Sequence, residues 1–139
     1  IQKIEINKII LECVNRLLET ILYYKKKGFN IVGYGPVATF KDENKNNIPV
    51  NRYFGNEVLR NKVTQFFNNY YKNLCYNNDI PFFTIFNYLI DSNLKSKKNY
   101  HTNDCMHYSI KVLPFILEEM ELISLISKEE KVLCLKHII

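Results

Sequence analysis

Long amphipathic helix patterns alternate with short apolar runs along the chain, and this order constrains the fold more than any other feature. Apolar residues at three- and four-residue spacing predict helices over residues 5–27 and 52–76. Each is followed by a run of branched and aromatic residues, 29–36 and 80–86, that is typical of a buried strand. Gly28 ends the first helix, because glycine takes the left-handed cap conformation at no steric cost. This helix–strand order, which occurs twice, predicts an α/β fold with a short parallel sheet flanked by helices.

The remaining segments connect or extend these units. Polar residues 37–51 predict an exposed loop that leaves the carboxyl end of the first strand, where α/β folds often carry a site. We expect a short helical turn over 87–94 and helices over 110–126 and 128–138. Pro114 is compatible with the third helix if it lies in its first turn.

Length and charge restrict the classes of protein to which the chain can belong. A chain of 139 residues supports one core, so we predict a single domain over 1–139. The net charge of +5 comes from lysines that cluster at 25–27 and 95–98, at element ends and in a loop, where solvated lysines are common. They are not interleaved with aromatic residues on one face, so we predict no nucleic-acid partner. No apolar run reaches the roughly 18 residues of a membrane span, so none is predicted.

The four cysteines predict neither a disulfide framework nor a zinc site, because no two of them form a CxxC pair. Cys13 and Cys134 fall on apolar helix faces and are expected to behave as small hydrophobic residues. The absence of a signal-peptide pattern favours the cytoplasm and otherwise leaves the compartment open.

One short motif carries candidate chemistry. Asp104 and His107 lie three residues apart in a polar loop, and Ser109 follows as the expected cap of the next helix. A serine hydroxyl needs a neighbouring imidazole to accept its proton, and a carboxylate on Nδ1 holds that imidazole in the correct tautomer. A tight turn lets Asp104 fold back onto the His107 ring, so the pair is a candidate acid/base dyad.

The segment from Asp104 to Ser109 resembles the last sequence block of SGNH/GDSL-type hydrolases, an esterase and lipase family. Residues 31–36, 58–71 and 81–86 are similar to the strand, helix and strand that precede this block in the family. The resemblance implies a flavodoxin-like three-layer sandwich and a Ser-His-Asp triad that hydrolyses acyl esters without a cofactor. In that triad His107 is the general base, and Asp104 is its orienting carboxylate.

The chain departs from the family at the nucleophile, because the Gly-Asp-Ser block and its oxyanion-hole partners are absent. Ser92 is no substitute, since no glycine precedes it and it follows the wrong strand. The expected architecture is therefore a domain truncated at its N-terminus. We expect an N-terminal segment or another subunit to complete the sheet and to supply the serine.

A metal site is a second chemical interpretation, because His101, Asp104, Cys105 and His107 are all possible ligands. The ligands must then share one tight loop, and no distant histidine or cysteine group completes a tetrahedral set. We therefore predict no metal and no other cofactor.

A non-catalytic protein-interaction module is the alternative to an enzyme. Its partner face would be the aromatic stripe of the second helix, Phe66, Phe67, Tyr70 and Tyr71. Such a stripe is more typical of a core, because burying each ring stabilises the fold by about 1.5–3 kcal/mol.

Overall fold

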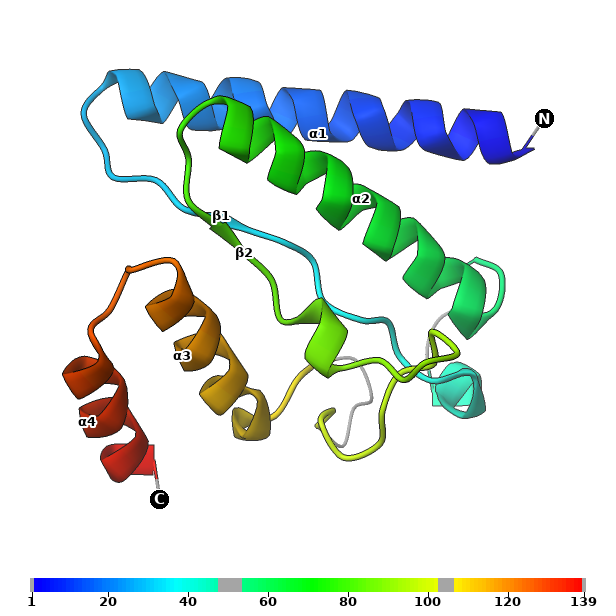
Figure 1. Cartoon of the computed structure of the whole chain (residues 1–139). Helices are drawn as coiled ribbons and strands as arrows, with labels where there is room; N and C mark the ends of the chain where they lie inside the picture. Colours follow the sequence, from blue (N-terminus) through cyan, green and yellow to red (C-terminus); the bar gives the residue numbers. More distant parts are fainter. Residues whose placement is uncertain (1, 48–53, 103–106, 139) are drawn as a thin grey trace.

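The computed structural model describes residues 2–47, 54–102 and 107–138, and it is mostly helical. Two short strands run between a pair of long helices and a pair of shorter ones (Figure 1). In chain order the elements, with η for a 3-10 helix, are α1 (Gln2–Lys26), β1 (Gly33–Tyr34), η1 (Asp42–Asn47), α2 (Glu57–Asn77), β2 (Phe82–Phe83), η3 (Phe86–Tyr88), η4 (Ile110–Val112), α3 (Leu113–Leu122) and α4 (Lys128–Ile138).

The two strands form a parallel pair, as the sequence predicts, with Gly33 opposite Phe82. The N–H of Gly33 donates to the carbonyl oxygen of Pro81 at 2.8 Å, and the N–H of Gly35 donates to that of Phe83 at 2.9 Å. Each strand is only two residues long, so both predicted runs, 29–36 and 80–86, were too long, and the second already enters η3 at Phe86. An α/β arrangement is therefore confirmed, with a sheet of two strands in the part of the chain that the structure describes.

Local signals explain where the helices begin and end. Asn56 caps α2, because its side-chain oxygen accepts the N–H of Leu59 at 2.9 Å. Gly28 follows α1 with a φ of 87°, which confirms the predicted cap. Pro114 lies in the first turn of α3, where its missing N–H leaves no hydrogen bond unmade.

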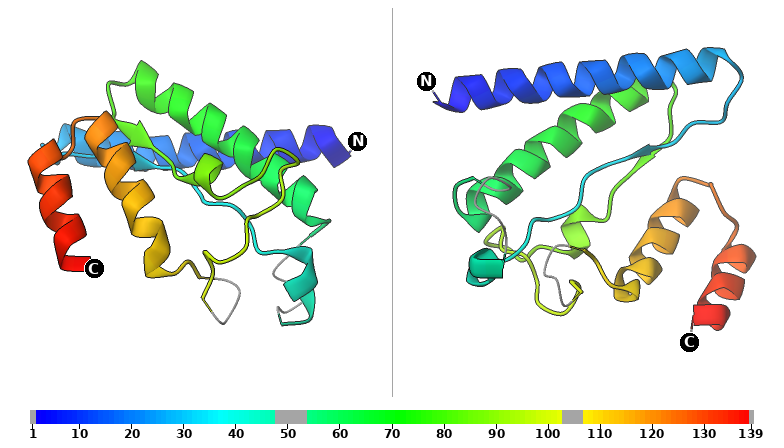
Figure 2. Two further views of the ribbon diagram at one scale, coloured as in Figure 1. Left: turned by 60° about the horizontal axis from the view of Figure 1, so that its bottom comes forward. Right: turned by 180° about the vertical axis from the view of Figure 1, so that it is seen from behind.

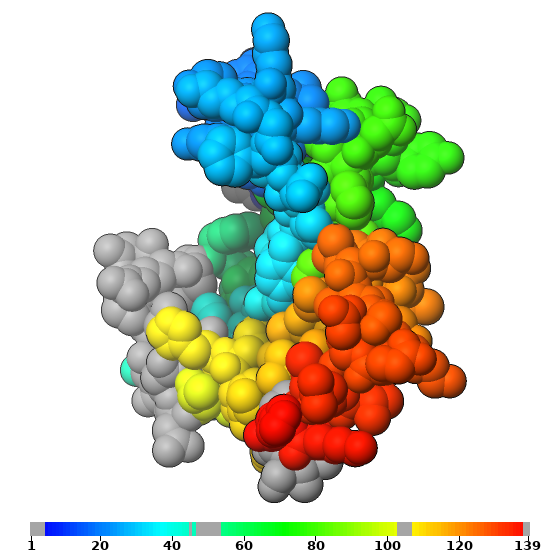
Figure 3. All heavy atoms as spheres, turned by 90° about the vertical axis from the view of Figure 1, so that its left-hand side faces the viewer, coloured from blue at the N-terminus to red at the C-terminus, as the bar shows by residue number. Residues whose placement is uncertain are grey.

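The described residues form two separate hydrophobic cores. In Figure 2 the α1–α2 pair and the α3–α4 pair lie on opposite sides of the two strands. The first core packs α1 against α2. Its buried residues are Ile10, Val14, Ile21, Tyr71, Cys75 and Ile80. The second core lies beyond the carboxyl ends of the strands, and its buried residues are Ala38, Ile85, Phe86, Leu89 and Val112. In the side view of Figure 3 the α1–α2 end and the α3–α4 end meet at a narrower middle.

Three expectations are corrected. The segment predicted as an exposed loop contains η1, and its Ala38 is only 3% exposed because it packs into the second core. Cys13 and Cys134 are exposed rather than buried, because both lie on the outer faces of their helices. The aromatic stripe of α2 is divided, with Tyr71 buried and Phe66 37% exposed.

No helix among the described residues combines the length and the apolar character that crossing a membrane requires.

Candidate functional site

The candidate histidine lies in a β-hairpin whose described arms are residues 100–102 and 107–109, called here the histidine hairpin. The N–H of Ser109 donates to the carbonyl oxygen of Tyr100, and the N–H of Thr102 donates to that of His107, both at 2.7 Å. His101 and Tyr108 form an antiparallel bridge between these two hydrogen bonds. The backbone of His107 is therefore fixed at the end of a short ladder.

The rings of His101 and Tyr108 contact each other across this ladder. The two residues lie opposite each other, and their ring centroids are 4.4 Å apart. His107 directly precedes Tyr108 and is exposed. The candidate histidine is therefore a surface residue whose backbone is held by the ladder.

Tyr108 anchors the histidine hairpin to the chain that leaves β1. Its hydroxyl donates to the carbonyl oxygen of Ala38 at 2.5 Å, across 70 residues of sequence. Burial raises the pKa of Tyr108, and the negative charge that Tyr34 would carry when ionised adds to the increase. The phenol therefore keeps its proton, and the anchor keeps its donor, throughout the neutral range.

The two residues of β1 face opposite sides of the sheet. Gly33 faces α2, since a Cβ built on it would lie 2.8 Å from the Sγ of Cys75. Side chains alternate along a strand, so Tyr34 faces the opposite side, where its ring lies 4.9 Å from that of Phe83. Tyr34 is 43% exposed, and partial burial raises its pKa. The hydrogen bond of Tyr108 to Ala38 thus ties the histidine hairpin to the chain that leaves the carboxyl end of β1.

The expected helix cap after this hairpin is confirmed. The Oγ of Ser109 accepts the N–H of Lys111 at 3.4 Å and starts η4, which leads directly into α3. Ser109 is therefore committed to a structural role and is not a second nucleophile candidate.

Asp104 and Cys105 lie outside the described residues, so the structure gives no distance between Asp104 and His107. The proposed metal set is described only in part, through His101 and His107. The described residues contain no group of three potential metal ligands.

The sequence did not predict the buried polar network that joins α2 to the chain after β1. The sequence favoured an apolar stripe on α2, but most of the fully buried residues of this helix are polar. The buried residues of α2 are Glu57, Arg60, Asn61, Asn68, Tyr71 and Cys75. The seven-residue spacing of Asn61, Asn68 and Cys75 is the signal that marks this face in the sequence.

Arg60 is at the centre of this network, and its side chain is 6% exposed. Its guanidinium donates to the carbonyl oxygens of Gly55 and Phe40 at 2.9 and 3.1 Å and to the carboxylate of Asp42 at 2.9 Å. Its Nε donates to the hydroxyl of Thr39 at 3.0 Å. The guanidinium therefore fixes the segment after β1 to the first turns of α2.

Glu57 and Asn61 bring a third segment into the same network. A carboxylate oxygen of Glu57 accepts the N–H of Ser96 at 2.5 Å. The side-chain amide of Asn61 donates to the carbonyl oxygen of Leu94 and accepts the N–H of Thr39 at 2.8 and 2.9 Å. These contacts are directed at protein groups, so the network positions loops at the carboxyl edge of the sheet and offers no evident ligand site.

The chain matches no family model, no curated protein and no solved structure.

Proposed function

We propose that this chain carries the acid/base part of a serine-dependent ester hydrolase of the SGNH type. His107 would be the general base, and Asp104 its orienting carboxylate. The observation that best supports this is the hydrogen bond of Tyr108 to Ala38, which ties the hairpin that contains His107 to the chain leaving the carboxyl end of β1. Active sites in open α/β sheets occur at this edge.

The proposed chemistry is acyl transfer. The imidazole of His107 takes the hydroxyl proton of a serine as the serine oxygen attacks the ester carbonyl, and it returns that proton to the departing alcohol. Water then releases the acyl group through the same base. The role of Asp104 rests on its spacing from His107, and the role requires no cofactor.

The nucleophile and the oxyanion-hole donors would come from an N-terminal segment or from another subunit. The sheet has an edge suited to such an addition. Gly33 and Gly35 donate to β2, so the backbone groups of Tyr34 point toward the opposite edge of β1. A strand that pairs there in parallel would bring its own carboxyl end beside the histidine hairpin.

The test is an activity assay on the polypeptide encoded by the complete reading frame that contains this chain. We expect it to hydrolyse a short acyl ester, such as p-nitrophenyl acetate, and to react with a fluorophosphonate probe at one serine. His107→Ala should lower kcat/KM by at least about a thousandfold, because removing a triad member costs orders of magnitude in rate. His137→Ala is the matched control, since it removes an exposed histidine from α4.

Equal activity in the His107→Ala variant and the parent protein would rule out the general-base role. Absence of both hydrolysis and probe labelling in the folded complete protein would instead favour the non-catalytic interaction module.

A further inference from the structure

The last helix packs one face against α3 and turns another away from the other elements that the structure describes. On its inner face, Lys131 of α4 forms ion pairs with Glu118 and Glu121 of α3, the first at 2.9 Å. A capping box starts α4, because Ser127 accepts the N–H of Glu130 while Glu130 accepts that of Ser127. The helix is thus well defined, and it lies at the edge of the molecule beyond α3 (Figure 1).

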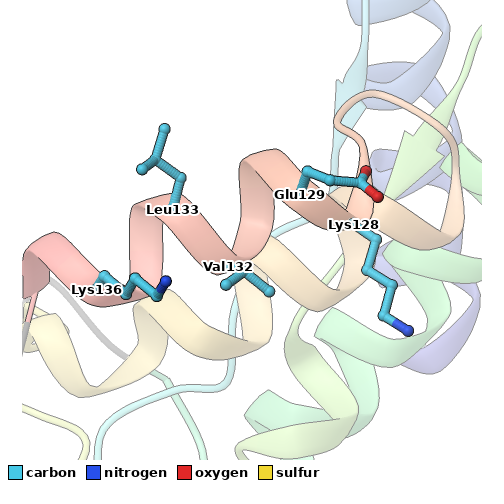
Figure 4. A pocket seen from close by; sticks show the side chains of 5 residues that line it. All are labelled: Lys128, Glu129, Val132, Leu133 and Lys136. Atoms are coloured by element: carbon cyan, nitrogen blue, oxygen red, sulfur yellow. The ribbon is translucent and has the colours of Figure 1, made fainter.

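The outer face of α4 carries a short stripe, defined here as Glu129, Val132, Leu133 and Lys136. Their three- and four-residue spacing places them on one side of the helix, well away from the Lys131 side. Val132 is 42% exposed and Leu133 is 58% exposed. Together with Lys128, the stripe lines a shallow hollow of about 420 Å³ (Figure 4).

We infer that this stripe pairs with the same stripe of a second copy of the chain, with the two α4 helices antiparallel. The argument is self-complementarity. A two-fold axis between Val132 and Leu133 puts each of them against the other residue in the second copy. The same axis brings Glu129 opposite Lys136 of the second copy, so two apolar contacts are flanked by two ion pairs.

Charge selects the antiparallel arrangement over the parallel one. In a parallel pair Glu129 would face Glu129 of the second copy, and Lys136 would face its own counterpart. Both contacts repel, whereas both flanking contacts attract in the antiparallel pair. A second copy is therefore a partner whose charges fit the stripe without any further assumption.

The expected association is weak, because two helix faces of this length bury far less than a standard stable interface. It should appear as a reversible monomer–dimer equilibrium at about 0.1–1 mM chain, and sedimentation equilibrium is the suitable measurement. Higher salt should raise the dissociation constant, since the flanking ion pairs are exposed to solvent.

A charge-swap series tests the register directly. Lys136→Glu replaces both attractive contacts with repulsive ones and should raise the dissociation constant about tenfold or more. The double variant Glu129→Lys/Lys136→Glu restores opposite charges across the axis and should return the constant to within about threefold of the parent. Lys72→Glu, on an exposed position of α2, changes the net charge equally and is expected to have no such effect.

Circular dichroism of each variant establishes that α4 remains folded, so that a change in association reports on the interface. A chain that stays monomeric at about 1 mM would overturn the inference. The inference would also be overturned if the double variant had as high a dissociation constant as Lys136→Glu. The same holds if Lys72→Glu raised the dissociation constant as much as Lys136→Glu does.

Discussion

The hydroxyl of Tyr108 donates a 2.5 Å hydrogen bond to the carbonyl oxygen of Ala38 and so joins the histidine hairpin to the segment that follows β1. Both partners belong to the second core, and Ala38 is only 3% exposed. The position of His107 relative to the sheet therefore depends on a side chain that is its immediate neighbour in sequence.

Tyr108→Phe should lower the free energy of unfolding by about 1–3 kcal/mol, because it leaves the buried carbonyl of Ala38 without this donor. Urea unfolding measures the change, and faster hydrogen exchange at the amide of Ser109 would locate it in the hairpin. Tyr76→Phe, at a residue that is 81% exposed, is the control with no expected effect. Matching unfolding midpoints in the two variants would show that the anchor contributes nothing.

Arg60→Met should destabilise the protein by about 2–4 kcal/mol, because it removes the ion pair with the partly buried Asp42 carboxylate and the guanidinium hydrogen bonds to the carbonyl oxygens of Gly55 and Phe40. Lys62→Met removes an exposed cation from the same helix and should change stability by less than about 0.5 kcal/mol. Thermal unfolding of the two variants is the comparison. A similar small loss in both would mean that the network adds little to stability.

Gly35→Ala should cost more than Gly28→Ala, although only Gly28 has a positive φ. A Cβ at Gly35 would lie 2.1 Å from the Oδ1 of Asn68 and 2.8 Å from the ring of Phe82, so both side chains must move, and the buried Asn68 amide would lose its hydrogen bond to the carbonyl oxygen of Pro36. A Cβ at Gly28 meets nothing within 4 Å, and only the backbone cost of about 1 kcal/mol applies. We expect a loss of about 2–3 kcal/mol for Gly35→Ala. The reverse order in denaturant unfolding would contradict the close approach.

Stability should fall between pH 9 and pH 11 in part because of Tyr71. Burial is the main cause that raises its pKa to about 12 from an ordinary value of 10.0. Between pH 10 and about pH 12 the Tyr71 hydroxyl stays protonated in the folded state but is largely ionised in the unfolded state. The free energy of unfolding therefore decreases as pH rises through this range. The expected contribution is about 1 kcal/mol at pH 11. Urea unfolding at pH 9 and at pH 11 measures this loss. The free energy of unfolding should decrease less in Tyr71→Phe than in the parent protein, and an equal decrease would show that Tyr71 does not contribute.

The helices and the parallel pairing could be predicted because their signals are local. Each of these signals lies within a few neighbouring residues. Examples are the apolar spacing of residues 5–27, the cap at Gly28 and the position of the proline in α3. The strands were predicted longer than they are, because a ladder requires a partner. Only the stretch around Gly33 has β2 beside it in register.

The polar network escaped prediction because burial of a charged residue depends on distant segments. Arg60 reads as a surface cation, yet its partners come from the chain after β1 and from the loop before α2. Tyr108 likewise reads as one aromatic residue among many until Ala38 is placed opposite it. The role of His107 stays a prediction from its motif, and nothing in the sequence indicated that Tyr108 would hold the hairpin in place.

Because the two cores are separate, a substitution that destabilises one of them need not change the structure of the other. Val14 of α1 is fully buried in the first core, while the anchor of the histidine hairpin draws on the second. Truncating Val14 would loosen the α1–α2 end and lower the melting temperature, while the spacing between Tyr108 and Ala38 stayed as it is. Such a variant would unfold at a lower temperature, yet its folded molecules would still hold the histidine hairpin in the same place.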